Sequence, residues 1–370
     1  MDFGLTDEQR ALAETLRRYL ADECPATRVR TAMESENGHD AALWQGLCDL
    51  GVLALAVPET LGGMGDELLS LALVSEQIGY AAAPGPFVGA ATAVVALANA
   101  DDADAAASWL PRIASGEALA TAAVGESGGR WDADELAAKV DVDNGDGVKQ
   151  SGQLRGTKSQ VPYGSLADLH VVAARDGDDV AVWIVERARP AVVASDLSGN
   201  DLTRRLSSVE YRGAEARRIG GRRTFEKMRD AALILLAADA YGGARRCLDM
   251  AREYALTREQ FGQPIGAFQA VKHQLANLAV EIEPSMSLWW YAAHAFDRIP
   301  DQAPRHAALA KAFSSDLFDR AARDSTELHG GIGFTWEFDL HLWLRRSMFD
   351  RAFFGDAHYH RARAAALAGW

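Results

Sequence analysis

One long helical run near the middle of the chain limits the possible folds more than any other feature. Residues 224–262 read "TFEKMRDAALILLAADAYGGARRCLDMAREYALTREQFG", with apolar residues at helical spacing. At 1.5 Å per residue such a run is long enough for roughly 45 Å of helix. Its centre is almost all Ala and Leu with Gly242 and Gly243, small residues that let neighbouring helices approach closely. We therefore expect a buried core helix here.

Helical patterns also occupy the first hundred or so residues. Thr6, followed three residues later by Gln9, forms a capping-box pattern at the start of a helix. Three further helical patterns, each with a glycine placed as a stop, lie at 41–51 (Gly51), 67–81 (Gly79) and 102–116 (Gly116). The N-terminal region is therefore predicted to be a helical bundle.

The pattern changes to short strands from about Leu119. Four segments rich in β-branched residues are divided by Gly and Asp turns, at 169–175, 180–186, 190–197 and 204–213. They predict an antiparallel β unit, and the lack of βαβ alternation disfavours a doubly wound sheet. Helical spacing returns after Gly220 and Gly221 and continues to the C-terminus. Two or three packed units are expected for 370 residues.

Charge and composition exclude several classes of function. A net charge of -14 disfavours a nucleic acid or an anionic membrane as the main partner. The most apolar stretch, at 87–98, is too short to cross a bilayer, so we expect a cytoplasmic protein without membrane insertion. The cysteines are far apart, which supports neither disulfides nor zinc: Cys24, Cys48 and Cys247. The histidines form no ligand set, so we expect no metal site.

A nucleotide site, if present, must be built without the common glycine loops. No GxGxxG follows a strand and no Walker loop occurs. Residues 257–276 instead predict a helix end, a Pro/Gly interruption and a new helix, a junction presenting Arg258, Gln260 and Gln269. A guanidinium and free N–H groups there could hold a pyrophosphate, although an ordinary solvated helical hairpin has the same pattern. Further on, Pro284 predicts a kink or a boundary between two helices.

Three separated motifs together resemble the acyl-CoA dehydrogenase family. They are "LGVLALAVPETLGGMG" (50–65) with "EQIG" (76–79), "REQFGQPIGAFQAVKHQLA" (258–276) and "ELHGGIGFTWE" (327–337). The resemblance implies an α+β fold with an N-terminal helical domain (1–117), a middle antiparallel β-barrel-like domain (118–219) and a C-terminal four-helix bundle (220–370). It also implies FAD, α,β-desaturation of an acyl-CoA thioester, and electron transfer to an electron-transfer flavoprotein.

The resemblance also assigns cofactor-binding roles to individual residues. Arg258, Gln260 and Phe261 match the family's flavin-diphosphate motif, and Gln269 matches its partner at the next helix start. Gly330 and Gly331 match the turn that lies against the dinucleotide. Asp356 and His358 match small polar residues near the adenylate half. In this family such groups typically reach FAD bound mainly to a neighbouring subunit, which implies an oligomer.

The chain departs from the family at the catalytic base and in the middle domain. The usual glutamate precedes the glycine that corresponds to Gly355, and this position is Phe354; the alternative position, on the long helix, is about Ala232. The flavin and substrate loop reads "VGESGGRWD" (124–132) and the flavin-contact segment "TKSQVPYG" (157–164), with Gln160 and Pro162 replacing an aromatic and a hydroxyl contact. The chain's own flavin cradle is therefore in doubt.

Two explanations compete. In the first, Asp356 is an unorthodox base whose pKa is raised by Phe353 and Phe354 and which His358 orients, although it lies two residues beyond the usual position. In the second, which we prefer, the chain is the partner subunit of a mixed α2β2 oligomer acting on bulky, often steroid, thioesters. A homo-oligomer, a nitroalkane-oxidase-like enzyme with Asp356 as base and a flavin-free structural homologue are the alternatives.

Overall fold

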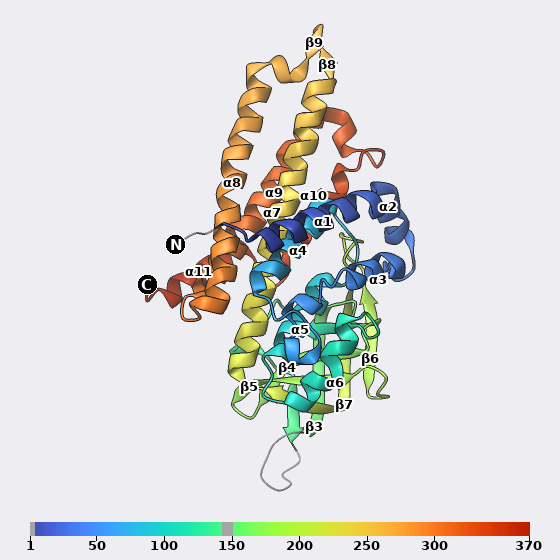
Figure 1. Ribbon diagram of the computed structural model, residues 1–370, viewed down its shortest axis with the longest axis vertical. Coiled ribbons are helices and arrows are strands. Elements are labelled where there is room, and N and C mark those ends of the chain that lie inside the picture. Colours follow the sequence, from blue (N-terminus) through green and yellow to red (C-terminus); the bar gives the residue numbers. More distant parts are fainter. Residues whose placement is uncertain (1–3, 143–150) are drawn as a thin grey trace. The chain divides into compact units, whose positions relative to one another are not determined.

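The computed structural model describes residues 4–142 and 151–370. In chain order, helices come before and after a β-rich middle region, which confirms the predicted α+β class with a helical start and a helical end (Figure 1). The N-terminal helices are α1 (Asp7–Glu23), α2 (Ala26–Glu34), α3 (Ala41–Asp49), α4 (Leu68–Ala81), α5 (Phe87–Ala98) and α6 (Ala103–Ala114). The C-terminal helices are α7 (Arg222–Thr257), α8 (Gln269–Arg298), α9 (Ala303–His329), α10 (Leu340–Ala352) and α11 (Ala357–Leu367).

Local capping signals are confirmed, with one exception. The Thr6 Oγ1 accepts the Gln9 N–H at 3.2 Å, and the Gln9 Oε1 accepts the Thr6 N–H at 3.1 Å. Gly51 and Gly116 follow the ends of α3 and α6 with φ of +78° and +79°, a conformation that favours glycine. The prediction that Gly79 stops a helix is wrong, because α4 continues to Ala81.

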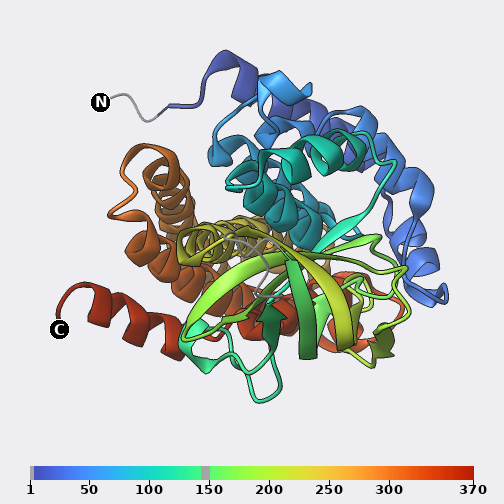
Figure 2. The ribbon, with the colours of Figure 1, turned by 90° about the horizontal axis from the view of Figure 1, so that it is seen from below.

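The strands form a small barrel, and its curved sheet is visible in Figure 2. They are β1 (Ala120–Ala123), β2 (Lys139–Val142), β3 (Ser151–Pro162), β4 (Leu169–Asp176), β5 (Asp179–Glu186), β6 (Val192–Leu197) and β7 (Leu206–Gly220). The order β4-β2-β3-β7-β5 closes on itself because β5 also pairs with β4. Trp183, Tyr211 and Leu154 are fully buried in its core.

The prediction of a purely antiparallel unit is partly wrong. Most pairs are antiparallel, but β1 runs parallel to β4, with Ala120 opposite Leu169, and β2 pairs with β4 in parallel at one position. A parallel pair needs a long connection between its strands, and the 45 residues between β1 and β4 supply one. Strand neighbours of this kind cannot be read from the alternation of side chains along one segment.

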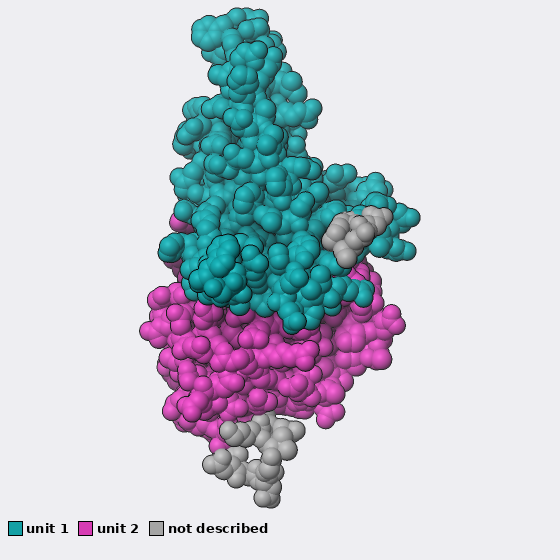
Figure 3. Space-filling view, turned by 90° about the vertical axis from the view of Figure 1, so that its left-hand side faces the viewer, with its two compact units in different colours: residues 1–31, 72–83, 233–370 teal, residues 32–71, 84–232 magenta. Residues whose placement is uncertain are grey.

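The chain divides into two compact units, which Figure 3 shows in different colours. Unit 1 contains Met1–Thr31, Ala72–Ala83 and Leu233–Trp370; unit 2 contains Ala32–Leu71 and Pro84–Ala232. Both units are thus assembled from separated segments. The two domain boundaries expected after residues 117 and 219 stay a prediction.

Glycines allow close helix packing in unit 1. A Cβ at Gly79 would lie 2.1 Å from the Asp239 carbonyl oxygen, and one at Gly242 would lie 2.0 Å from the Glu76 carbonyl oxygen. The backbones of α4 and α7 therefore touch where neither helix carries a side chain. This contact explains why Gly79 lies inside a helix rather than at its end, and it confirms the expected role of Gly242.

Pro284 neither ends nor divides its helix. The helix α8 runs from Gln269 to Arg298 with Pro284 inside it, so the predicted helix boundary is wrong. Proline removes one intrahelical hydrogen bond, and the helix continues across it. The hydroxyls of buried Ser285 and Ser314 lie 2.7 Å apart across these two helices. Figure 1 shows α7, α8 and α9 side by side in this unit.

Three simpler features of the described residues bear on function. None of their helices has both the length and the apolar content needed to span a bilayer. No cluster of three or more His, Cys, Asp or Glu within residues 4–142 and 151–370 is arranged to hold a metal ion. The three cysteines are buried and free.

Candidate functional site

A tight hairpin presents the predicted diphosphate motif. Strands β8 (Glu259–Gln260) and β9 (Gln263–Pro264) are joined by Phe261 and Gly262, both with positive φ, +53° and +78°. Two consecutive positive φ angles are typical of a type I′ turn, which glycine accepts readily and phenylalanine rarely does. The Phe261 side chain is 93% exposed and meets the edge of Phe268 at 6.1 Å. Strain and exposure at one residue make this hairpin a candidate for a binding surface.

The N-terminus of α8 and Arg258 are brought together behind this hairpin. The Ile265 N–H donates to the Arg258 carbonyl at 2.8 Å, and the Phe268 N–H donates to the Ile265 carbonyl at 3.1 Å. Phe268 is the N-cap of α8 and supplies no side-chain acceptor to the first-turn N–H groups. Arg258 is exposed and has no ion-pair partner within the described ranges. Free N–H groups beside a free guanidinium fit a diphosphate.

The two glutamines of the motif lie at the same junction. Gln260 is exposed on β8 and donates through its Nε2 to the Glu259 carbonyl at 2.8 Å. Gln269 is exposed as the first residue of α8. Both side chains are therefore exposed at the junction with Arg258, and their binding of a ligand there stays a prediction.

An aromatic stack that sequence reasoning missed connects Arg258 to the glycine turn. Tyr254, whose carbonyl accepts the Arg258 N–H at 2.8 Å, packs 4.5 Å from His329, and His329 packs 4.6 Å from Phe338. His329 immediately precedes Gly330, so the stack holds the turn close to the end of α7. The sequence did contain one signal for this stack: Tyr254 is an aromatic residue one helical turn before the RxxFG motif, which begins at Arg258.

The glycine turn itself is open. Gly330 has a φ of +62°, and a Cβ at Gly330 or Gly331 would meet no atom within 4 Å. Three large apolar side chains beside it are partly or mostly exposed: Ile332, Phe334 and Trp336. Space above both glycines and exposed apolar groups next to them fit a surface that another molecule covers.

The position of the usual base is a buried phenyl ring. Phe354 is 4% exposed, has a φ of +62° and meets Phe353 edge-on at 5.0 Å. Its carbonyl lies 2.8 Å from the His360 Nε2, and the buried Lys311 Nζ donates to the Gly355 carbonyl at 2.9 Å. The other position, Ala232, is fully buried on α7. Neither site carries a group that can accept a proton.

Asp356 caps a helix instead of serving as a buried acid. Its carboxylate accepts the Tyr359 N–H at 2.8 Å at the N-terminus of α11, and the side chain is exposed. This backbone hydrogen bond lowers the pKa of Asp356 below its ordinary value, and the opposing effect of burial does not reverse the shift. The expected rise in the pKa of Asp356 is therefore wrong. His358 lies in the first turn of the same helix with an exposed side chain.

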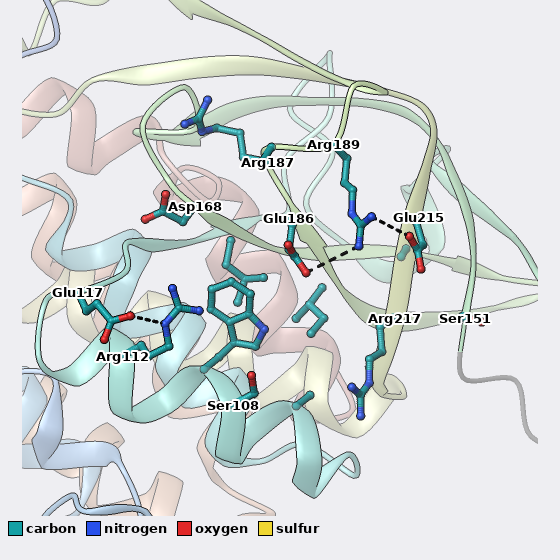
Figure 4. A pocket seen from close by; sticks show the side chains of 16 residues that line it. Ser108, Arg112, Glu117, Ser151, Asp168, Glu186, Arg187, Arg189, Glu215 and Arg217 are labelled. Carbon is teal, nitrogen blue, oxygen red and sulfur yellow. Dashed lines mark hydrogen bonds and ion pairs between the residues drawn. The ribbon is translucent and has the colours of Figure 1, made fainter.

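A polar hollow in unit 2 is a poor site for an acyl chain. It has a volume of about 750 Å³ and lies between α6 and strands β5 and β7 (Figure 4). Its charged groups neutralise one another: Arg112 pairs with Glu117 at 2.7 Å, and Arg189 pairs with Glu215 at 3.1 Å. Such a lining favours neither an apolar tail nor an anion.

Comparisons with known proteins agree with this geometry. "Acyl-CoA dehydrogenase, N-terminal domain" matches residues 6–117, and "Acyl-CoA dehydrogenase, C-terminal domain" matches residues 221–368. Acyl-CoA dehydrogenase IpdE2 of Mycobacterium tuberculosis is 35% identical over 92% of this chain and 91% of that protein. Acyl-CoA dehydrogenase FadE34 of the same organism is 34% identical over 98% of this chain, which spans 48% of FadE34.

Solved structures of complexes are also similar. The ChsE4-ChsE5 complex from Mycobacterium tuberculosis superposes with a TM-score of 0.91 at 28% identity, covering 100% of this chain and 99% of that chain. A variant of the Tcur3481-Tcur3483 steroid ACAD superposes with a TM-score of 0.90 at 28% identity, covering 98% of both chains. On the matched domains and the identity over nine-tenths of its length, this chain belongs to the acyl-CoA dehydrogenase family.

Proposed function

We propose that this chain is a subunit of an FAD-dependent acyl-CoA dehydrogenase complex that desaturates an acyl-CoA thioester between Cα and Cβ. In this proposal the chain contributes contacts to FAD that is held mainly by a sister subunit, in an α2β2 assembly. The sister subunit supplies the carboxylate base, and an electron-transfer flavoprotein accepts the electrons.

The apolar base position is the observation that carries the proposal. An α C–H is barely acidic, so a positioned base must remove its proton. Phe354 and Ala232 are buried and cannot accept one, and Asp356 is engaged as a helix cap. A chain that keeps the family fold without a base at either usual position is best explained as a partner of one that has it.

The preserved anion site gives the chain its own role in the complex. When bound, FAD supplies the hydride acceptor for the β hydrogen. Arg258 and the free N–H groups of α8 would hold its diphosphate, because they are exposed and lack internal partners among the described residues. Gln260, Phe261, Gln269 and the open Gly330–Gly331 turn would line the rest of the contact, with His358 and Asp356 near the adenylate half.

The names of similar proteins support the partner and the substrate class. Two of the similar structures are complexes of two named subunits, and one is called a steroid ACAD. We infer a mixed oligomer with a sister acyl-CoA dehydrogenase subunit and a bulky, steroid-derived acyl-CoA as the substrate. A homo-oligomer is the other outcome that subunit analysis would detect.

The proposal is tested by expressing the chain alone and together with a family member that carries the missing glutamate. The chain alone should be colourless and inactive, and the co-purified complex should be yellow and should oxidise the thioester. Arg258→Ala should release FAD from the complex, because it leaves a diphosphate charge without its partner. Arg252→Ala, an exposed arginine on α7 outside the site, is the matched control.

Three results would point elsewhere. Thioester oxidation by the isolated chain that Asp356→Asn abolishes would make Asp356 the base. Oxygen consumption with nitroalkanes would favour a nitroalkane-oxidase-like enzyme. A complex without flavin, whatever the partner, would make the chain a structural homologue.

A further inference from the structure

The segment that corresponds to the family's flavin loop is closed by one of its own side chains. Trp131 is only 4% exposed although it follows four exposed residues, 127–130. A Cβ at Gly125 would lie 2.6 Å from the Trp131 ring and 3.1 Å from the Ser159 carbonyl oxygen. The indole therefore lies directly against the Gly125 backbone, in space that any side chain at position 125 would need.

The loop is folded back so that the indole reaches this position. Glu126 and Arg130 pair as an isolated antiparallel bridge, and Gly128 and Gly129 between them have φ of +87° and +75°. Both glycines adopt a conformation that other residues rarely take. The turn brings Trp131 back over Gly125, so the indole ring fills the space that the loop encloses.

A buried ion pair ties the loop to the second flavin-contact segment. The Lys158 Nζ lies 2.6 Å from the Glu126 Oε1 and donates to the Val124 carbonyl at 3.1 Å, with both side chains buried. Glu126 also accepts the N–H groups of Ala137 and Ala138, at 2.7 and 3.0 Å. Burial lowers the pKa of Lys158 to about 8, and Glu126 opposes that shift. The pair is satisfied by four hydrogen bonds and is costly to break.

The backbone of the second segment completes the closure. The Ser159 N–H donates to the Gly125 carbonyl at 2.9 Å, and the next residue, Gln160, has a φ of +59°. Segments 124–132 and 157–164 are thus bonded directly to each other. The resemblance to the acyl-CoA dehydrogenase family places a flavin ring against these two segments, and a ring bound there would meet the Trp131 indole.

We propose that Trp131 is an internal plug that excludes flavin from this chain's own middle domain, locked in place by the Lys158–Glu126 pair. The inference rests on the proposed function, which places FAD in a sister subunit. It adds that the exclusion is built into the loop and is not merely a loss of contacts at Gln160 and Pro162.

The test uses the isolated full-length chain and lumiflavin, which carries the flavin ring but no diphosphate. Trp131→Gly should retain at least tenfold more lumiflavin in equilibrium dialysis than the unaltered chain. Trp109→Gly, a half-buried tryptophan on α6 in the same unit, is the matched control and should gain nothing. Circular dichroism and a thermal melt establish that each variant is folded.

Two outcomes would overturn the plug. A folded Trp131→Gly chain that retains no more lumiflavin than the Trp109→Gly control would show that the indole does not occupy a flavin-sized space. Stoichiometric FAD binding by the unaltered isolated chain, undiminished by Arg258→Ala, would show that the middle domain is open. The second measurement does not depend on any variant at position 131.

The proposed function and the proposed Trp131 plug can be refuted independently of each other. Lumiflavin binding to Trp131→Gly does not require a sister subunit, so it would survive the failure of a mixed complex. Loss of FAD from the complex through Arg258→Ala tests the lent contacts alone, because lumiflavin has no diphosphate for Arg258 to hold.

Discussion

Substitutions at Asp356 distinguish a helix cap from a catalytic base. The carboxylate satisfies one of the free N–H groups of α11, at 2.8 Å from the Tyr359 nitrogen. Replacing a cap of this kind by alanine costs about 1 kcal/mol of unfolding free energy, and the side chain is exposed, so no burial is lost with it. Asp356→Ala should therefore destabilise the chain by about 1 kcal/mol in urea unfolding. Asp356→Asn and Asp356→Ser keep an acceptor and should lose less than about 0.5 kcal/mol.

The pH dependence of this difference follows from the lowered pKa of Asp356. A carboxylate whose pKa is lower in the folded state stabilises the fold above its unfolded pKa, near 3.8. That contribution disappears as the pH falls below this value through the folded pKa. The stability gap between the unaltered chain and Asp356→Ala should thus be constant at neutral pH and shrink below about pH 4. Equal destabilisation by Asn, Ser and Ala, or a gap that grows in acid, would refute the cap.

Three further predictions concern unit 1. Gly242→Ala should destabilise it by more than about 2 kcal/mol, because its Cβ would meet the Glu76 carbonyl; unchanged thermal stability would contradict this contact. Arg346→Met should cost about 3–5 kcal/mol, since it removes the guanidinium that binds buried Asp239 at 2.7 Å, and Asp239→Asn in the same chain should recover part of that loss. Burial raises the pKa of Glu76 to about 7 from 4.5. The free energy of unfolding of the unaltered chain, relative to that of Glu76→Gln, should therefore fall by about 3 kcal/mol between pH 4.5 and 7. Parallel pH profiles of the two proteins would contradict the raised pKa.

Features set by neighbouring residues in the chain were predictable. The capping box of Thr6 and Gln9 and the start of α8 at Gln269 depend on side chains within four residues of each other. Gly79 and Pro284 were misread because their effects depend on distant partners. The Asp239 carbonyl explains the glycine inside α4, and α8 continues across its proline where it lies against α9.

In the candidate site, too, some features follow from the sequence and others depend on the tertiary structure. The amino-acid sequence by itself determined which chemical groups are missing: no carboxylate exists at positions 354 or 232, whatever the fold does. It also placed Arg258 beside a helix start, because both lie in one local motif. Only the tertiary structure decided that Tyr254 stacks on His329 and that Trp131 covers Gly125. Composition is a property of each residue alone, whereas burial, pKa and contact depend on which distant surfaces exclude water from it.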